Sequence, residues 1–205
     1  MNKTKALTSL GITLLFAPLA VFGRLETGAV APEFTLTDTS GAERSLSEFK
    51  GNYVVLEWTN HECPFVKKHY ASGNMQNLQR EFTEKGVVWL TVLSSGKGKQ
   101  GCVSAEKANA LIEASESAPT AYLLDYDGAV GRRYAAQTTP HMYVIDPEGK
   151  LVYQGAIDDV RSADPSDVKG AKNYISVALG ELMAGSSVSV SDTQPYGCSV
   201  KYTRK

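Results

Sequence analysis

Cys63 is the residue whose type and surroundings point most directly to chemistry. It follows an apolar run, residues 53–58, that predicts a buried strand, and it directly precedes Pro64, a residue suited to the first turn of a helix. A cysteine at such a junction caps the helix, where unpaired backbone N–H groups and the helix dipole stabilise a thiolate. Because the thiolate is the nucleophilic form of cysteine, we predict that Cys63 is reactive.

The alternative for Cys63 is a buried structural cysteine that packs as a small hydrophobic side chain. The proline directly after it, the polar residues 60–62 directly before it and its position at a strand end argue against burial. Lys67 and Lys68, one turn further along the helix, are expected to favour the thiolate modestly. We therefore prefer the reactive interpretation.

Glu57 and Pro140 are the next candidates for the site. Glu57 lies inside the apolar strand, where a buried carboxylate has a raised pKa and could relay protons; alternatively, strand alternation turns it towards a polar edge. The Thr139–Pro140 bond precedes another predicted strand. If it is cis, a backbone edge stays open beside Cys63; if it is trans, the proline starts an edge strand, and the sequence does not decide between the two.

The N-terminus predicts export. Lys3 and Lys5 precede an uncharged apolar stretch, residues 6–20, and residues 1–23 have the order of a secretory signal peptide. The stretch is shorter than the roughly 20 residues of a spanning helix, so an uncleaved anchor is the weaker alternative. We expect a periplasmic protein, in which cysteines can form a disulfide.

The remaining chain predicts one α/β domain, residues 32–185, after a linker at 24–31 and before a tail at 186–205. Alternating elements imply a central mixed β-sheet flanked by helices. The expected strands are 34–37, 53–58, 87–93, 121–124, 141–145 and 151–153; the expected helices are 64–86 with a kink at 72–74, 104–114, 129–134 and one from Ser166 to Gly185.

Composition limits the possible partners. The net charge is -1 and there is no basic stripe, so we expect no nucleic-acid partner, and no segment after the signal peptide is apolar enough to place the mature form in a membrane. His61 and His141 are expected to line the site, whereas His69 is expected to be solvated or to pack. Cys63 with His61 gives too few ligands for a structural zinc site, and no cofactor is expected.

Several motifs resemble a known group. Glu57, Cys63–Pro64, Thr139–Pro140 and residues 143–146 resemble the thioredoxin-fold redoxins, and residues 31–38 look like the N-terminal signature of peroxiredoxins and secreted thioredoxin-like proteins. Over residues 31–202 the chain is similar to the peroxiredoxin-like redoxin group (alkyl hydroperoxide reductase/thiol-specific antioxidant superfamily). Members carry similar Glu-Trp-Thr-Asn-x-x-Cys-Pro-Phe-Val-Lys-Lys-His-Tyr and Pro-Tyr-Gly-Cys-Ser-Val-Lys-Tyr blocks. The resemblance implies a thioredoxin fold with an N-terminal redoxin extension and an irregular C-terminal tail.

The same resemblance assigns roles and exposes departures. It maps Cys63 onto the first redox cysteine, Glu57 onto the buried acid beneath it and Pro140 onto the cis proline. Val66 stands where thioredoxin has its second cysteine. A typical peroxiredoxin has a threonine three residues before its peroxidatic cysteine, where this chain has Asn60, and an arginine at about the place of Pro140. Those two groups polarise the peroxide, so their absence argues against efficient peroxidase activity.

A single-cysteine centre needs a second thiol to resolve its mixed disulfide. Cys102 and Cys198 are both candidates, and the resemblance favours Cys198. We therefore predict an exported thiol–disulfide oxidoreductase that acts on protein or small-molecule thiols and disulfides and draws on an external thiol reductant. The alternatives are a thiol peroxidase for hydroperoxides and a non-enzymatic protein that binds a soft metal such as copper.

Overall fold

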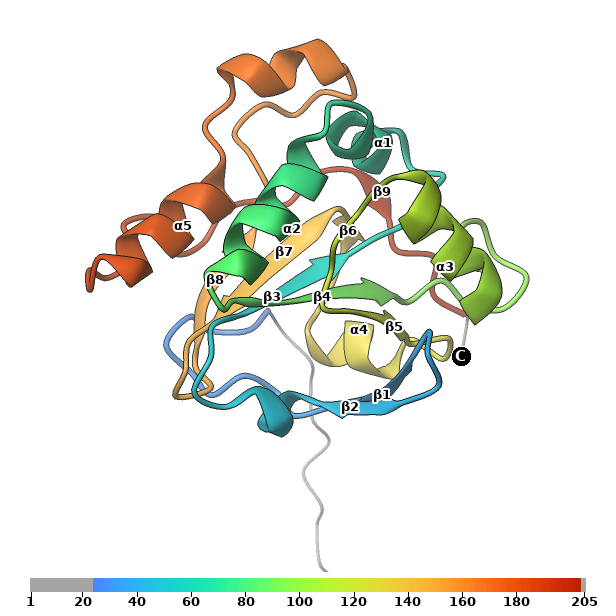
Figure 1. Ribbon diagram of the computed structural model, residues 1–205, viewed down its shortest axis with the longest axis horizontal. Coiled ribbons are helices and arrows are strands. Elements are labelled where there is room, and N and C mark those ends of the chain that lie inside the picture. Colours follow the sequence, from blue (N-terminus) through green and yellow to red (C-terminus); the bar gives the residue numbers. More distant parts are fainter. Residues whose placement is uncertain (1–23, 204–205) are drawn as a thin grey trace, which may run out of the picture.

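A seven-stranded mixed sheet forms the centre of the protein (Figure 1). The computed structural model describes residues 24–203, so the predicted signal peptide lies outside the described residues. The strand order is β2-β1-β5-β4-β3-β7-β8, with β3, β4 and β5 parallel and the other neighbours antiparallel. The strands are β1 (Thr35–Asp38), β2 (Glu43–Ser45), β3 (Val54–Trp58), β4 (Val88–Leu93), β5 (Ala121–Leu124), β7 (His141–Ile145) and β8 (Leu151–Gly155). The prediction of a mixed sheet is confirmed.

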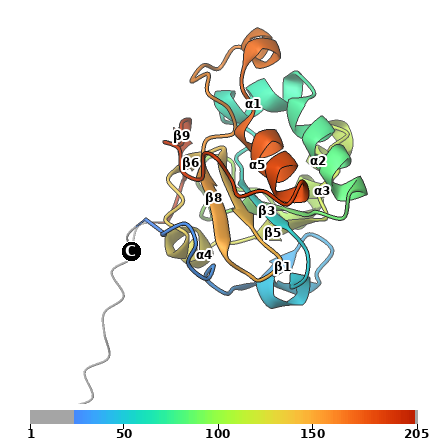
Figure 2. The same ribbon diagram turned by 90° about the vertical axis from the view of Figure 1, so that its left-hand side faces the viewer.

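Helices cover both faces of this sheet. Figures 1 and 2 show α1, α2, α3 and α5 on one side and the short α4 on the other. Their bounds are α1 (Pro64–Ala71), α2 (Asn74–Glu84), α3 (Ala105–Ala114), α4 (Ala129–Arg133) and α5 (Tyr174–Met183), and 3-10 turns occupy Leu46–Phe49 and Pro165–Gly170. Two large apolar clusters fill the space between the sheet and these two layers.

Strand β3 lies between β4 and β7 and carries the chain to the N-terminus of α1. All five of its residues are buried, as expected for a strand covered on both faces. Val55 belongs to the cluster under α2 and α5, whereas Leu56 and Trp58 belong to the opposite cluster. By strand alternation Glu57 points to the same side as Val55, which places a carboxylate in the interior.

Two helix predictions need correction. The segment 64–86 forms two helices, because Gly73 adopts a left-handed conformation (φ 73°) and starts α2 afresh. The single helix predicted from Ser166 is a 3-10 turn followed by α5. Residues between them stay extended because the Tyr174 N–H donates to the Ile157 carbonyl at 2.9 Å, and the Asn173 side chain then caps α5.

The C-terminal tail packs along the domain. The Thr193 N–H donates to Gln154 O on β8 at 3.0 Å, and Gly96 N donates to Lys201 O at 2.9 Å. Between these contacts β9 (Cys198–Ser199) pairs with β6 (Thr138–Thr139) as a separate two-stranded sheet. Figure 2 shows this red segment beside β8 and β6. The domain boundaries remain predictions, and within the described range no helix is both long and apolar enough to cross a membrane.

Candidate active site

Cys63 lies at the junction of β3 and α1, as predicted. It is the N-cap of α1, with an extended backbone (φ -70°, ψ 126°), and Pro64 is the first helical residue. The turn before it closes with a hydrogen bond of 2.9 Å from Cys63 N to Asn60 O, and Cys63 O accepts from Lys67 N at 2.9 Å. The sulfur therefore sits where the first N–H groups of the helix have no intrahelical partner.

The expectation that Cys63 is not buried is wrong. Its exposed fraction is 0%. The thiol Sγ donates to the carbonyl oxygen of Thr139 at 3.1 Å, and Thr139 belongs to β6, whose partner strand is the tail segment β9. The residues of the turn do not signal this burial, because the tail segment that pairs with β6 lies about Cys198, 135 positions further along the chain.

The tail strand β9 brings Cys198 close to Cys63. In the antiparallel β6–β9 pair, Cys198 stands opposite Thr139, and the two thiols lie within hydrogen-bonding reach of each other. Gly197 permits this approach: its φ is 130°, and a Cβ atom there would collide with the Thr139 carbonyl. None of the three cysteines, all of which lie in the described range, is in a disulfide.

The two thiols are tuned in opposite directions. Burial alone would raise the pKa of Cys63. Hydrogen bonds from the side chains of Cys198 and Thr139 and from the Val66 backbone nevertheless bring that pKa below its ordinary value. Burial raises the pKa of Cys198 to about 11, and its hydrogen bond to Cys63 and the charge of Cys63 act in the same direction. Cys63 is therefore the thiol of the pair that ionises first as pH rises. Neither neighbouring lysine is among the leading influences on the pKa of Cys63.

The hydrogen bonds around Cys63 serve two protonation states. The Thr139 carbonyl accepts a hydrogen bond only from the neutral thiol, whereas the Val66 N–H and the Cys198 S–H stabilise the thiolate. Ionisation of Cys63 therefore ends the hydrogen bond to the Thr139 carbonyl, while the Thr139 side chain, the Val66 N–H and Cys198 stabilise the thiolate.

Glu57 is fully buried and accepts hydrogen bonds from four side chains. Its Oε1 atom accepts from the Tyr70 hydroxyl at 2.8 Å. Its Oε2 atom accepts from Gln79, Trp89 and Thr91 at 3.1, 2.9 and 3.2 Å. Burial raises the pKa of Glu57 despite these donors. The alternative of a polar edge is excluded, and a proton on Oε1 could be passed to the Tyr70 hydroxyl.

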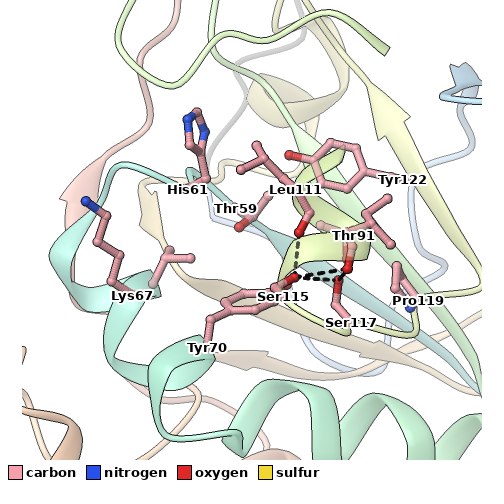
Figure 3. Close-up of a pocket in the computed structure, with 12 residues that line it drawn as sticks. Thr59, His61, Lys67, Tyr70, Thr91, Leu111, Ser115, Ser117, Pro119 and Tyr122 are labelled. Atoms are coloured by element: carbon pink, nitrogen blue, oxygen red, sulfur yellow. Dashed lines mark hydrogen bonds between the residues drawn. The ribbon is translucent and has the colours of Figure 1, made fainter. Parts of the chain in front are cut away.

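A cavity of about 170 Å³ lies on the α1 side of the sheet, close to Glu57 (Figure 3). Tyr70 and Thr91, two of the four side chains bonded to Glu57, line it. His61 and Lys67 also belong to its lining, as Figure 3 shows. Through Tyr70 and Thr91, which contact it and also line the cavity, the buried carboxyl adjoins the space between α1 and α3.

A model of the AhpC/TSA family matches residues 27–154, more than half of the chain. The chain belongs to the AhpC/TSA family. The matched residues include Glu57, Cys63 and Pro140, whereas Cys198 lies beyond them. The family assignment confirms the resemblance to the redoxins.

Three known proteins resemble this AhpC/TSA family member over most of its length. Thiol-disulfide oxidoreductase ResA of Bacillus subtilis is 30% identical over 70% of this chain and 75% of its own. The crystal structure of an uncharacterized conserved protein from Geobacillus kaustophilus is similar with a TM-score of 0.74 and 27% identity, over 88% of this chain and 94% of that one. The thioredoxin domain of a thiol-disulfide oxidoreductase from Bacteroides vulgatus is similar with a TM-score of 0.52 and 28% identity, over 71% of this chain and 96% of that one. The predicted thioredoxin fold is confirmed.

Cys102 occupies a different part of this redoxin. It lies in the loop after β4, which contacts the turn before Cys63 through a 3.1 Å hydrogen bond from Gly101 N to Glu62 Oε2. Cys102 lies near Tyr126: burial raises the pKa of the Tyr126 hydroxyl, and the charge of Cys102 raises it further. Among the groups that dominate the pKa of Cys63, Cys198 is present and Cys102 is not.

The three histidines separate into two kinds. His69 is buried on α1 and bonds Asn74 at 2.9 Å, so it packs. His141 is buried beside Tyr143, at 3.1 Å from its hydroxyl, and burial lowers the pKa of His141 to about 3. His61 is part of the cavity lining. Within residues 24–203 no group of three or more histidine, cysteine or acidic residues is arranged to hold a metal ion.

Sequence reasoning missed two kinds of neighbour. The Thr139 carbonyl is a backbone group, and no residue type signals it. Lys68, Asp158 and Tyr196 form a buried polar cluster beside the tail, so Lys68 pairs with Asp158 rather than extending towards Cys63. The Tyr-Gly-Cys sequence at 196–198 was a usable signal, since glycine beside a cysteine permits close backbone approach.

Proposed function

We propose that this protein is an exported thiol–disulfide oxidoreductase in which Cys63 is the nucleophile and Cys198 is the resolving thiol. The observation that carries the proposal is the pairing of β9 with β6, which puts Cys198 opposite Thr139 and beside the sulfur of Cys63. Its membership of the AhpC/TSA family and its similarity to thiol-disulfide oxidoreductases support an oxidoreductase enzyme of this type.

The first step is attack by the Cys63 thiolate on one sulfur of a substrate disulfide. A new S–S bond joins Cys63 to the substrate, the old S–S bond breaks, and the other substrate sulfur leaves as a thiolate that takes up a proton. The lowered pKa of Cys63 raises the fraction of the nucleophile that is ionised relative to an ordinary cysteine. The N-terminus of α1 stabilises that charge through its unpaired N–H groups.

The second step transfers the bond to the tail. Cys198 loses its proton and attacks the Cys63 sulfur, the substrate leaves as a thiol, and a Cys63–Cys198 disulfide remains. The charge and hydrogen bond of Cys63 contribute to the raised pKa of Cys198, and both contributions end once Cys63 is in a mixed disulfide. Cys198 thus becomes a better nucleophile only after the first step. An external thiol reductant then returns two electrons to the pair.

Glu57 and Pro140 have supporting roles in this proposal. Glu57, with its raised pKa, exchanges a proton through the Tyr70 hydroxyl and the adjoining cavity. Pro140 fixes the preceding Thr139, whose bond to it is cis and whose carbonyl contacts Cys63. Because β9 occupies the edge of β6 and Cys63 is fully buried, a protein substrate and a small disulfide both reach the sulfur only when the tail moves aside.

The two alternatives are less favoured. A peroxidase requires groups that polarise the peroxide, yet the Asn60 side chain is engaged elsewhere, with Oδ1 accepting from Glu62 N at 2.9 Å and Nδ2 donating to Gln100 O at 3.4 Å. A copper site built from Cys63, His61 and His141 gains no support from the described residues, where no such group is arranged for a metal.

Export to the periplasm rests on the sequence of residues 1–23. The mature protein isolated from a fractionated expression host is expected to begin near Arg24 and to appear with the periplasmic proteins. Mass spectrometry of the intact chain checks this. A mature protein that still begins at Met1 would contradict cleavage, and recovery with the cytoplasm would contradict export.

Reduction of insulin with dithiothreitol as the electron donor tests the proposed activity. We expect the wild-type protein to accelerate precipitation of the insulin B chain, Cys63→Ser to fall to the uncatalysed rate, and Cys102→Ser to match wild type. Consumption of hydrogen peroxide by the same three preparations measures the alternative. Activity that survives Cys63→Ser, or peroxide consumption without insulin reduction, would overturn the proposal.

A further inference from the structure

A buried charged cluster lies between α1 and the C-terminal tail, away from the cysteine pair. Lys68 and Asp158 are 1% and 2% exposed, and their Nζ and Oδ2 atoms are 3.1 Å apart. Lys68 Nζ also donates to the Val160 carbonyl at 2.7 Å. Burying an ion pair usually gives little or no net stability relative to well-packed apolar residues, so this cluster calls for another explanation.

Tyr196 is the tail residue that enters this cluster. Its hydroxyl donates to Asp158 Oδ1 and lies 3.4 Å from His69 Nε2 and 3.5 Å from Lys68 Nζ. Its ring packs edge-on against Phe65, with 5.8 Å between the centroids. One tyrosine of the tail is thus fixed by three polar side chains and one aromatic ring.

The cluster connects the two cysteines through one helix. Cys63 caps α1, and Lys68 and His69 come from the middle of that same helix. Tyr196 lies two residues before Cys198, and the intervening Gly197 passes against the Thr139 carbonyl. Besides the β6–β9 pairing, a short path along α1, across Tyr196 and through one glycine links the two sulfur atoms.

A second anchor holds the tail on the other side of Cys198. The Tyr202 hydroxyl donates to the Ala136 carbonyl at 2.8 Å, and the Arg132 guanidinium lies over its ring at 4.6 Å. Tyr202 is four residues beyond Cys198, twice as far along the chain as Tyr196. Tyr196 is consequently the anchor with the tighter control of the sulfur.

We propose that Tyr196 is a positioning residue for the resolving step: through Lys68, Asp158 and His69 it holds Cys198 where it can attack a mixed disulfide on Cys63. This inference rests on the proposed function. Its consequence is that loss of the Tyr196 hydroxyl slows resolution without slowing the first attack by Cys63. A loss of 1 Å in placement typically costs about 10- to 100-fold in an intramolecular step.

The chromogenic disulfide dithiobis(nitrobenzoate) separates the two steps. Attack by Cys63 breaks the aromatic disulfide, forms a mixed disulfide and releases one nitrothiobenzoate. Attack by Cys198 on the Cys63 sulfur breaks that bond, forms Cys63–Cys198 and releases a second nitrothiobenzoate. A Cys102→Ser background removes the third thiol, and one equivalent of the reagent leaves none for a separate reaction at Cys198, so stopped-flow absorbance records a fast phase and a slow phase for this pair alone.

Tyr196→Phe keeps the ring against Phe65 and removes only the hydroxyl. We expect a fast phase that is not slowed and a slow phase retarded at least about tenfold. The matched control is Tyr134→Phe, which removes another buried tyrosine hydroxyl, bonded to the Pro32 carbonyl at 2.6 Å, far along the chain from the tail. Both phases should stay as in the background protein, while urea unfolding reports how much stability each variant loses.

A second variant guards against a simple loss of stability. Lys68→Met combined with Asp158→Leu replaces the ion pair by apolar side chains, a change that is often neutral or stabilising. It nevertheless removes the partner of the Tyr196 hydroxyl. We expect the slow phase to be retarded under conditions where urea unfolding shows the variant to be fully folded, a combination that a merely structural role does not produce.

The outcomes separate this inference from the function beneath it. An unchanged slow phase in both Tyr196→Phe and the Lys68/Asp158 double variant would overturn the positioning role while leaving the Cys63–Cys198 pair intact. Equal retardation in Tyr134→Phe would overturn it as well. Release of a single nitrothiobenzoate by the background protein, or two by its Cys198→Ala form, would instead refute the resolving role of Cys198.

Discussion

The corner between β3 and α1 and the tail strand β9 each present one thiol, and the two thiols differ in almost every physical respect. Cys63 is fully buried at a helix N-cap with a lowered pKa. Cys198 is half-buried in a two-residue strand with a pKa raised to about 11. Cys63 lies inside the part of the chain that the AhpC/TSA family model matches, and Cys198 lies outside it.

The contrast between Cys63 and Cys198 shows how one fold can divide a two-thiol reaction between two unlike environments. The corner supplies charge stabilisation from the helix, so it suits the group that attacks first. The tail supplies proximity, and its thiol stays protonated until Cys63 is consumed. A thioredoxin places both cysteines in one helical turn, whereas here Val66 occupies that second position and the partner arrives from the other end of the chain.

Removal of the Cys198 thiol should have the largest effect on the two-step reaction. Cys198→Ala should still permit the first attack but reduce steady-state insulin reduction by about 100-fold, because resolution then depends on a second molecule of thiol. Intact mass spectrometry of the reaction mixture should show substrate or reductant bound to Cys63. Turnover equal to wild type, or equal loss in Cys102→Ala, would contradict the division.

A smaller effect is expected at the buried acid beneath the corner. The pKa of Glu57 is raised in the folded protein, so folding favours the protonated carboxyl. Its contribution to stability is present at pH below the ordinary glutamic acid value and is lost as pH rises through the folded pKa. Each tenfold difference in the ionisation constant corresponds to about 1.4 kcal/mol.

Glu57→Gln resembles the protonated carboxyl and should remove this loss. Urea unfolding of both proteins at a series of pH values above 4.5 checks it: wild type should become less stable relative to Glu57→Gln as pH rises. The variant should also keep the β6–β9 pairing, so the yield of Cys63–Cys198 disulfide serves as its control. Parallel stability curves for the two proteins would show that Glu57 titrates normally.

The smallest expected effect concerns the coupling between the two thiols. The Cys198 thiol donates to the Cys63 thiolate, so Cys198→Ala should raise the pKa of Cys63. The pH dependence of Cys63 alkylation by iodoacetamide measures this, in a Cys102→Ser background. The midpoint should move to higher pH when Cys198 is absent. A midpoint that stays in place would mean that the helix alone sets the pKa of Cys63.

The corner could be predicted from sequence because its signals are local. The apolar run to Trp58 and the proline at 64 fix a strand, a turn and a helix within a few residues, and they place Cys63 at the N-cap. The burial of Glu57 followed less surely, since it depends on both sheet faces being covered by helices. The break at Gly73 was visible in sequence as a kink but not as a new helix start.

The tail could not be predicted because its contacts are distant along the chain. Nothing in residues 186–203 has the periodicity of a strand or helix, and the two-residue β9 exists only through its pairing with β6. The polar residues that anchor it, Lys68 and Asp158, read as surface charges in isolation. The burial of Cys63 was missed for the same reason, because the segment that covers it is this tail.

Disulfide mapping of the oxidised protein tests the central claim most directly. The full chain is treated with one equivalent of a small disulfide oxidant, remaining thiols are blocked, and the protein is digested without reduction and analysed by mass spectrometry. The account predicts a peptide pair joining Cys63 to Cys198, with Cys102 recovered in its blocked form. A pair joining Cys63 to Cys102, or a Cys63 that carries only the oxidant and no crosslink, would contradict it.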